Sequence, residues 1–576
     1  MKHALKLLAS VVLAFGTAIP GGRAQTNASP LASRMPADGA TNVSPDTHLT
    51  LTFNAQVGAG TSGEIRVRDA SDGSIVDRLD LSIPAGPTRR PAGTGATLQD
   101  AATYQRAVIG GFAEGFHFYP VLAHDRTATI VLHPGVLKYG RTYDVEIDPG
   151  AIAIAGFPGF AGPNRWRFRT RSHPPAASSN RIVVAADGSG DFNTVQGAVD
   201  SVPDSHAGRV TIFIRAGRYE EIVYFRGKRD ITFLGEDRDA VVIGYANNEN
   251  FNGPPPSVPT NERPGTFPYR RAAFMADAST GIHLVNLTLR NFTPQGGSQA
   301  EALLLMGGRN IVSHVTALSF QDTVQFNDSV FVTDSLIEGE TDFLWGRGPA
   351  FFERTILREV SNSPFMWVRS TSASHGFVFV DCRFETTATE GPGPLLARNT
   401  AAYPDSEIVL IDSLLGRISP VAWLLPETIT QARYWEAGSV DLASGGPADI
   451  SRRHAASRQL NRERDANAIA QYRDPAFVLG GWTPSMAPIV LSPPRSAAVN
   501  AGAGISLTAA AAAVPAPAFE WRRNGKPVVD DSRIAGARSG TLTIASVRKT
   551  DAGRYTVVVA NPAGKVESAR AVVTVR

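Results

Sequence analysis

The chain has 576 residues, too many for a single hydrophobic core, so about three domains are expected. Hydrophobic residues make up 43% and charged residues 19%, as in a globular protein, and 54 Gly with 39 Pro favour short strands and turns over long helices. The formal net charge of +3 comes without a basic run, which argues against a nucleic-acid-binding protein but is compatible with an acidic polysaccharide as partner.

An export signal is predicted at residues 1–24. Lys2, His3 and Lys6 precede an apolar run at 7–19, and small residues before Gln25 suit cleavage. The run is too short for a membrane-spanning helix, and no later stretch is long and apolar enough for one. We therefore expect a secreted, periplasmic or cell-surface protein with no membrane span.

Cys382 is the only cysteine, which excludes an internal disulfide. We expect it to pack as a small buried hydrophobe. Because it lacks a Cys/His neighbourhood, a zinc site is not expected. The sequence thus predicts neither a metal nor a cofactor.

Residues 29–172 are predicted to form a β-sandwich. Alternating strand-like segments lie at 48–53, 64–68 and 142–147, with turn residues between them. The opening and closing segments of this region resemble bacterial Ig-like modules. A Pro/Ala/Ser-rich stretch at 173–179 then suggests a linker.

Residues 180–484 contain short apolar strands that recur at intervals of 28, 20, 20, 27 and 31 residues. The intervals are counted between Asn286, His314, Asp334, Arg354, Asp381 and Asp412. Repeats of 20 residues or more built from brief strands predict a right-handed parallel β-helix with loops of variable length. We interpret the six marker residues as turn or surface positions and not as ligands.

The region 487–576 resembles an immunoglobulin domain. Trp521 matches the core tryptophan of that fold, and the segment ending at Tyr555 matches the tyrosine corner. Ala509 and Val557 occupy the positions of the usual cysteines. We expect packing to replace the disulfide.

Four polar residues in the β-helix are predicted to meet on neighbouring coils. Residues one coil apart stack at about 4.8 Å. Gln299 and Gln321 are 22 residues apart, and Asp322 and Asp342 are 20 apart. Two amides and two carboxylates should therefore gather at one place, although aspartates that merely cap turns in adjacent coils remain an alternative.

Five short motifs accompany these residues. They are Gly217-Arg-Tyr-Glu-Glu221, Gln299-Ala-Glu-Ala-Leu303, Gln321-Asp-Thr323, Asp342-Phe-Leu-Trp-Gly346 and Leu396-Ala-Arg398. In order and spacing, the region resembles the pectin methylesterase (pectinesterase) family over about half of the chain. The resemblance starts near Val184 and ends near Trp482.

The resemblance implies a carboxylic ester hydrolase that removes methyl groups from methyl-esterified galacturonan and releases methanol. Asp342 would be the nucleophile, and Asp322 the acid and then the base. Gln299 and Gln321 would donate to the oxyanion. Arg398 would hold Asp342 ionised, so that the shared proton resides on Asp322.

Aromatic side chains near the motifs are candidates for contact with sugar rings. Trp345, Trp423 and Phe343 are the predicted substrate-binding residues, although Phe343, like Trp367, also suits packing in the coil. Family members usually follow the arginine with Pro-Trp, whereas this chain has Asn399-Thr400. An aromatic wall near the ester methyl is therefore expected to be missing.

Other functions stay open at this point. A lyase or polygalacturonase on the same fold is disfavoured because the motifs of those enzymes are not evident. An esterase of the same scaffold acting on an acetyl ester or acyl thioester is one alternative. A non-catalytic wall- or polysaccharide-binding protein is another, since the Ig-like modules could contact cell wall or another protein.

Overall fold

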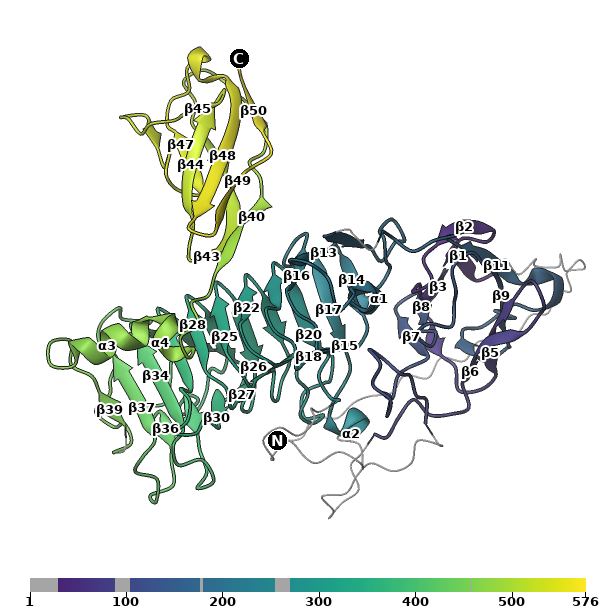
Figure 1. Cartoon of the computed structure of the whole chain (residues 1–576), viewed down its shortest axis with the longest axis horizontal. Coiled ribbons are helices and arrows are strands. Elements are labelled where there is room, and N and C mark those ends of the chain that lie inside the picture. The colour runs from purple at the N-terminus through teal and green to yellow at the C-terminus, as the bar shows by residue number, and fades with distance from the viewer. Residues whose placement is uncertain (1–28, 89–103, 177–179, 254–269, 456) are drawn as a thin grey trace, which may run out of the picture.

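The computed structural model describes residues 29–88, 104–176, 180–253, 270–455 and 457–576 (Figure 1). The predicted export signal and residues 177–179 of the predicted linker lie outside these ranges. The all-β prediction, with a parallel β-helix at its centre, is confirmed. Within the described ranges, no helix has the length and apolar character needed to cross a membrane.

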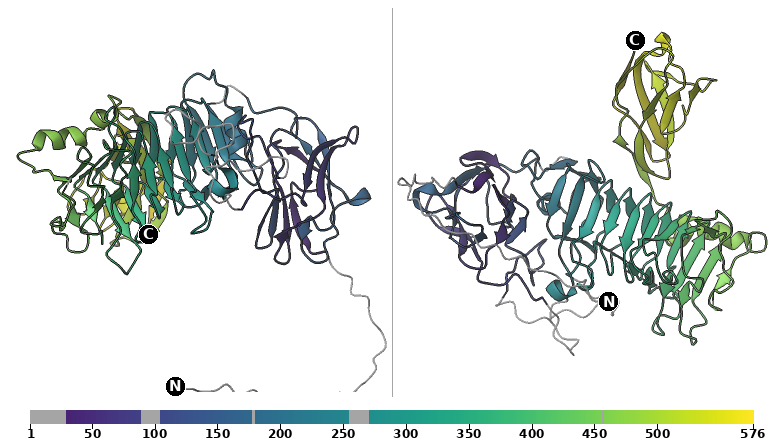
Figure 2. Two further views of the ribbon diagram at one scale, coloured as in Figure 1. Left: turned by 90° about the horizontal axis from the view of Figure 1, so that it is seen from below. Right: turned by 180° about the vertical axis from the view of Figure 1, so that it is seen from behind.

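Three parallel sheets form the β-helix, and successive coils stack along its axis (Figures 1 and 2). Sheet 1 comprises β12 (Arg181–Val184), β13 (Val210–Ile214), β16 (Ile231–Gly235), β19 (His283–Val285), β22 (Asn310–Ser313), β25 (Val330–Thr333), β28 (Ala350–Glu353), β31 (Phe377–Val380), β34 (Glu407–Ile411), β37 (Arg433–Ala437) and β39 (Arg458–Gln459). Sheet 2 comprises β14 (Gly217–Glu220), β17 (Val241–Tyr245), β20 (Thr288–Asn291), β23 (Thr316–Leu318), β26 (Leu336–Gly339), β29 (Ile356–Glu359), β32 (Arg383–Thr386), β35 (Leu414–Leu415) and β38 (Val440–Asp441). Sheet 3 comprises β15 (Val223–Arg226), β18 (Phe274–Asp277), β21 (Leu303–Met306), β24 (Val324–Phe326), β27 (Leu344–Gly346), β30 (Met366–Val368), β33 (Ala397–Arg398) and β36 (Trp423–Leu424).

The six marker residues form one repeated turn between sheets 1 and 2. All six have left-handed backbone, with φ between 48° and 58°. Asn, Asp and His are enriched in this conformation, which accounts for their choice at most of these turns. The backbone ladder also continues through the turn, since His314 N donates to Thr333 O at 3.2 Å and Asp334 N to Glu353 O at 3.3 Å. The markers are thus turn positions, as predicted.

Short helices close the β-helix. α1 (Val195–Ser201) places Val195, Ala198 and Val199 over the first coil, in the same apolar cluster as the interior of the β-helix. α3 (Ala466–Arg473) and α4 (Pro475–Val478) pack on the outer face of sheet 1. α2 (Glu249–Asn252) lies in the loop after β17.

The N-terminal module consists of two main sheets around one apolar core. The first contains β1 (Leu31–Met35), β3 (Leu49–Phe53), β8 (Thr127–Ile130) and β7 (Val121–His124). The second contains β2 (Ala40–Val43), β11 (Trp166–Thr170), β9 (Thr142–Ile147), β5 (Glu64–Asp69) and β6 (Ile75–Asp80). Two small strands, β4 (Gly58–Ala59) and β10 (Ile152–Ala153), and a 3-10 turn at Gly162–Asn164 complete the module.

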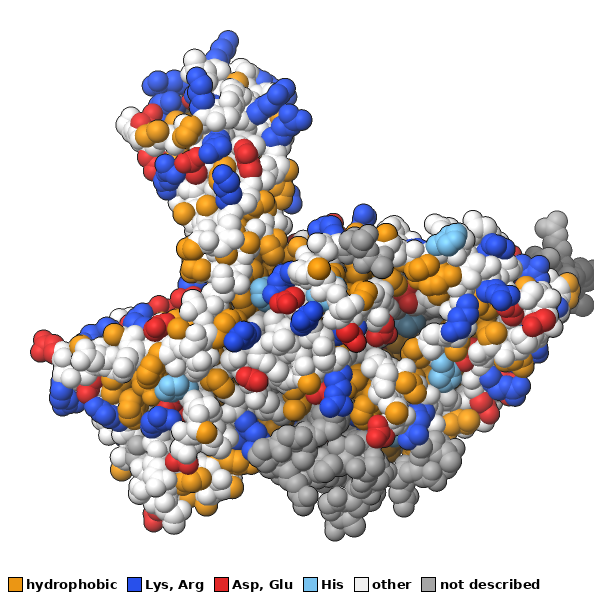
Figure 3. All heavy atoms as spheres, viewed as in Figure 1, with side chains coloured by type: hydrophobic (Ala, Val, Ile, Leu, Met, Phe, Trp, Pro, Cys, Tyr) orange, Lys and Arg blue, Asp and Glu red, His pale blue; other side chains and the backbone are white. Residues whose placement is uncertain are grey.

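The C-terminal module stands off the side of the β-helix (Figure 1). Its strands are β40 (Met486–Ser492), β41 (Ala497–Val499), β42 (Ile505–Thr508), β43 (Ala510–Val514), β44 (Ala518–Arg523), β45 (Lys526–Pro527), β46 (Ile534–Ala535), β47 (Thr541–Ile544), β48 (Gly553–Asn561), β49 (Gly564–Glu567) and β50 (Ala571–Val575), with a 3-10 turn at Lys549–Asp551. Trp521 is fully buried, and Tyr555 Oη donates to Asp551 O at 2.8 Å, which forms the predicted tyrosine corner. Ala509 and Val557 pack in the same core. Basic side chains are prominent on the face of this module seen in Figure 3.

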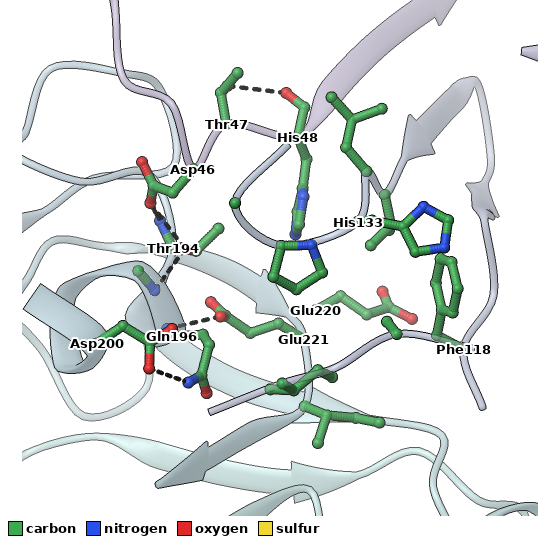
Figure 4. Close-up of a pocket in the computed structure, with 18 of the residues that line it drawn as sticks. Asp46, Thr47, His48, Phe118, His133, Thr194, Gln196, Asp200, Glu220 and Glu221 are labelled. Atoms are coloured by element: carbon green, nitrogen blue, oxygen red, sulfur yellow. Dashed lines mark hydrogen bonds between the residues drawn. The ribbon is translucent and has the colours of Figure 1, made fainter. Parts of the chain in front are cut away.

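The N-terminal module and the β-helix enclose a buried polar cavity of about 130 Å³ at the first coil (Figure 4). Asp46 of the module accepts from Asn193 N and Thr194 N, at 2.9 and 2.8 Å, beside the start of α1. Across the cavity, Glu221 accepts from the backbone N–H groups of Val195 and Gln196 at 2.8 and 2.9 Å. The Tyr/Glu motif around Glu221 is therefore a structural element of the first coil.

Glu221 should make the stability of the protein depend on pH. Burial raises the pKa of its carboxyl to about 7. In the folded state it keeps a proton that the unfolded chain loses above its ordinary pKa of about 4.3. Stability is therefore greatest at low pH and falls as pH rises toward 7, by on the order of 3 kcal/mol for this group.

The variant Glu221→Gln should flatten this dependence of the thermal unfolding midpoint, measured from pH 4.5 to 8. Glu220→Gln is the matched control and should keep the slope, since it retains Glu221. An unchanged slope in Glu221→Gln would assign the pH dependence to another group.

Candidate active site

Asp322 and Asp342 occupy equivalent turns on neighbouring coils, each two residues before a strand of sheet 3. Both have left-handed backbone, with φ of 67° and 53°, a conformation that aspartate tolerates better than most residues. Asp322 N donates to Thr341 O at 3.2 Å, and Val324 pairs with Leu344, so the two turns are adjacent rungs. The predicted meeting of the two carboxylates is observed.

Asp342 is held by Arg398. The guanidinium Nε donates to both carboxylate oxygens at 2.9 Å, and Nη2 forms a further short contact. The Asp342 side chain is 3% exposed and that of Arg398 is 30% exposed. A carboxylate gripped at both oxygens has a fixed orientation, and the arginine favours its charged form.

Asp322 has an arginine of its own, Arg271, which the sequence motifs do not reveal. Arg271 Nη2 donates to Asp322 Oδ2 at 2.9 Å. The same guanidinium binds Glu301 through Nε and Nη2, at 2.7 to 3.0 Å, and Glu249 through Nη1 at 2.9 Å. One buried cation therefore serves three buried carboxyls.

The charge balance decides which aspartate carries the proton. Burial raises the pKa of Asp322 well above its ordinary value, the negative charges of Glu301 and Asp342 add to the rise, and Arg271 opposes it. Burial also raises the pKa of Asp342, but there the direct hydrogen bonds from Arg398 oppose it. Arg398 therefore offsets the burial of Asp342 only in part. Because Arg398 serves one carboxyl and Arg271 serves three, the proton resides on Asp322.

The two glutamines lie at the rungs beside the aspartates. Ala300 N donates to Gln321 O at 3.1 Å, which places Gln321 next to the segment that carries Gln299. The Gln299 amide oxygen accepts from Ser298 Oγ at 2.9 Å, so its NH₂ group faces away from that hydroxyl. Both side chains are half-buried.

The aromatic residues divide between the two faces of sheet 3. Trp345 lies on the outer face, in register with Gln325 and Trp367. Phe343 and Trp423 are fully buried in the interior of the β-helix. The expectation that Phe343 and Trp423 contact sugar is therefore wrong, because their rings fill the core and reach no surface.

Three residues of the outer face were not predicted as site residues. The Arg369 guanidinium lies 3.6 Å from the ring centroid of Trp367 and 4.7 Å from that of Trp345. Arg398 lies 4.1 Å from the Trp367 ring, whose centroid is 6.0 Å from that of Tyr403. An aromatic and basic surface thus adjoins Asp342.

Comparison with known proteins places this region in a family. The pectinesterase family model matches residues 181–390, and the immunoglobulin I-set model matches residues 488–575. A pectinesterase of Olea europaea is 30% identical over 270 residues, which are 44% of this chain and 68% of that protein. The chain belongs to the pectinesterase family. It is a carboxylic ester hydrolase.

Other relatives of this pectinesterase include bacterial proteins. A pectinesterase of Ralstonia solanacearum is 28% identical over 276 residues, which are 41% of this chain and 69% of that protein. Among solved structures, a pectin methylesterase from carrot covers 52% of this chain and 93% of its own length at 22% identity, with a TM-score of 0.44.

The pectinesterase has a site made of carboxyl, amide, guanidinium and aromatic groups. In the described part of the chain, no group of three or more His, Cys, Asp or Glu side chains is arranged to hold a metal ion. Cys382 is buried, and burial raises the pKa of its thiol to about 12. It packs in the interior of the β-helix.

Glu301 should tune the pKa of Asp322. Glu301→Gln removes a negative charge and leaves Arg271 with fewer carboxyls to serve, so the pKa of Asp322 should fall. The basic limb of the pH–rate profile for ester hydrolysis, which reports a group that must be protonated, should then move to lower pH.

Glu340→Gln is the matched control, because that carboxylate accepts from Gln295 on a neighbouring loop and has no printed contact with the aspartates. Its profile should match that of the parent enzyme. An unshifted limb in Glu301→Gln would mean that Glu301 is already protonated in the working enzyme.

Proposed function

We propose that the chain hydrolyses the methyl esters of methyl-esterified galacturonan (pectin), releases methanol and acts outside the cytoplasm. The observation that carries the proposal is the pair of buried aspartates on adjacent rungs, each with a different arginine, inside the region matched by the family model. One carboxyl is thereby suited to act as a charged nucleophile and the other as a proton donor.

In the first half of the proposed reaction, a carboxylate oxygen of Asp342 attacks the ester carbonyl carbon. The N–H groups of Gln299 and Gln321 donate to the oxyanion that forms, a contribution typically worth several kcal/mol for one such donor. The bond to the methoxy oxygen breaks, and Asp322 gives its proton to that oxygen. Methanol leaves, and galacturonate remains as an acyl group on Asp342.

In the second half, Asp322 is a carboxylate and takes a proton from a water molecule. The hydroxide equivalent attacks the acyl carbon, and the bond to Asp342 breaks. The products are a galacturonate carboxylate, a charged Asp342 held by Arg398 and a protonated Asp322. The proton given to methanol in the first half is thus regained from water.

The aromatic surface supports recognition of the sugar. Trp345, Trp367 and Tyr403 lie on the side of sheet 3 that carries the aspartates, and aromatic rings pack well against the apolar faces of sugars. Thr400 occupies the place of the usual tryptophan. Thr400 O accepts from Tyr403 N at 3.1 Å, which brings the Tyr403 ring close to the site. We propose that Tyr403 and Trp367 form the aromatic wall instead.

Substitution of the aspartates tests the mechanism. Asp342→Asn removes the nucleophilic charge, so methanol release from highly methylated pectin should fall by several orders of magnitude. Asp322→Asn can neither give nor take the proton, and turnover should fall by about 10²- to 10⁴-fold. Both variants should still bind the polymer.

Asp328→Asn, an exposed aspartate on the same coil as Asp322, is the control and should keep full activity. Near-normal turnover in Asp342→Asn would rule out Asp342 as the nucleophile. Acetate release from acetylated pectin without methanol release would instead favour an esterase of another specificity, and no hydrolysis of either ester would favour a binding protein.

The aromatic wall has its own test. If Tyr403 limits the space beside the ester methyl, Tyr403→Ala should lower the preference for methyl over ethyl esters, by roughly 1 to 3 kcal/mol. Tyr403→Phe should keep the preference. Thr400→Trp should change it little, since the wall is present; a clear gain in Thr400→Trp would show that the wall is incomplete.

A further inference from the structure

One row of side chains runs along the outer face of sheet 3, parallel to the axis of the β-helix. Strand register aligns its members one to a coil. From the first coil onward they are Tyr224, Met275, Leu304, Gln325, Trp345, Trp367, Arg398 and Leu424. The two aspartates precede the strands of Gln325 and Trp345, so the row passes directly through the site.

Exposure changes sharply along this row. Tyr224, Met275 and Leu304 are 0 to 1% exposed although they point away from the core of the β-helix, and Gln325 is 2% exposed. Trp367 is half-buried, the Arg398 side chain is 30% exposed, and Leu424 is 55% exposed. The outer face is therefore covered before the aspartates and open after them.

The N-terminal module provides the cover. The rings of Phe112 and Phe116 each lie 5.6 Å from the ring of Tyr224. Gly110 approaches so closely that a Cβ there would lie 2.1 Å from Tyr224 O. Met275, Leu304 and Trp345 belong to the same apolar cluster as these phenylalanines, so a single core continues from the module onto sheet 3.

Hydrogen bonds fix the covering segment in place. His117 N donates to Asn252 Oδ1 at 2.8 Å, and Asn252 Nδ2 donates back to His117 O at 2.9 Å. Arg270 Nη1 donates to Gly115 O at 2.5 Å, and all three side chains are buried. Contacts of this kind belong to a permanent part of the structure.

Gln325 lies where the covered face meets the site. Its amide oxygen is buried and has no hydrogen-bond partner among the described residues. A buried acceptor without a partner is costly unless something else satisfies it. The terminal sugar of a chain carries a free hydroxyl that an internal sugar has spent in a glycosidic bond, and such a hydroxyl would satisfy the amide.

We propose that the N-terminal module closes one end of the substrate groove, so that the esterase acts on sugars at or near one end of a methylated galacturonan chain. This inference rests on the proposed function. A polymer can extend from the aspartates only over the open strands β30, β33 and β36. A site in mid-chain would need free surface on both sides, and β15, β18 and β21 offer none.

The test compares long and short substrates with the full chain. Highly methylated galacturonan and the same material cut to short oligomers by an endo-acting lyase, which is then removed, are supplied at equal ester concentration. An end-acting enzyme should release methanol from the oligomers several-fold faster, in proportion to the concentration of chain ends. Mass spectrometry of a methylated hexamer should place the first free carboxylates at one end.

Equal initial rates on both substrates, with free carboxylates inside the hexamer, would overturn the inference while leaving methyl ester hydrolysis intact. No methanol from either substrate would instead contradict the proposed function. Gln325→Leu should raise KM for the hexamer by about five- to tenfold with little change in kcat, whereas the exposed Gln471→Leu should change neither. An unchanged KM in Gln325→Leu would remove that residue from the closed end.

Discussion

The backbone ladder between successive coils is the interaction on which the site depends. Parallel strands spaced about 4.8 Å apart turn a separation of 20 residues along the chain into direct contact in space. The ladder is not confined to the strands, since it continues through the turns that hold His314, Asp322 and Asp342. The carboxylates are therefore positioned by backbone hydrogen bonds as well as by their side-chain partners.

Burial of so much charge is possible because each carboxyl is given a cation to share. Burying an ionised group without a partner is costly, and removal of one partner from a buried pair is strongly destabilising. Arg398 satisfies one aspartate almost completely, whereas Arg271 is divided among Asp322, Glu301 and Glu249. This unequal division produces two chemically different carboxyls from the same residue type.

The sequence predicts the fold well where a single period governs it. The marker intervals equal the register offsets in sheet 1, because both are set by the length of a coil: His283 pairs with Ile311, Asn310 with Val330 and Ala350 with Phe377. The C-terminal module was predictable for a similar reason, since the tryptophan and tyrosine-corner positions of its fold are local patterns.

Prediction of the site was less complete, for identifiable physical reasons. Motif spacing brings Asp322, Asp342 and Arg398 together, but Arg271 follows a long loop and has no coil interval that links it to Asp322. Its one signal was Glu301, a charge inside an otherwise apolar motif. Trp423 was misplaced because strand alternation decides the face: its neighbour in register is the inward Ala397. The predicted linker also suggested an independent N-terminal module, whereas the module shares a core with sheet 3.

The coil length between the two aspartates has a consequence for how such a chain can change. Coils elsewhere in this β-helix differ by up to eleven residues in register offset, since Asn310 pairs with Val330 at 20 and Phe377 with Ile408 at 31. Those differences are absorbed in loops and leave the rungs where they are. Duplication of a whole coil between β24 and β27, by contrast, would move the aspartates two rungs apart. Insertions can therefore remodel the rim of the groove freely, while any gain or loss of a repeat unit at this one place would abolish the site.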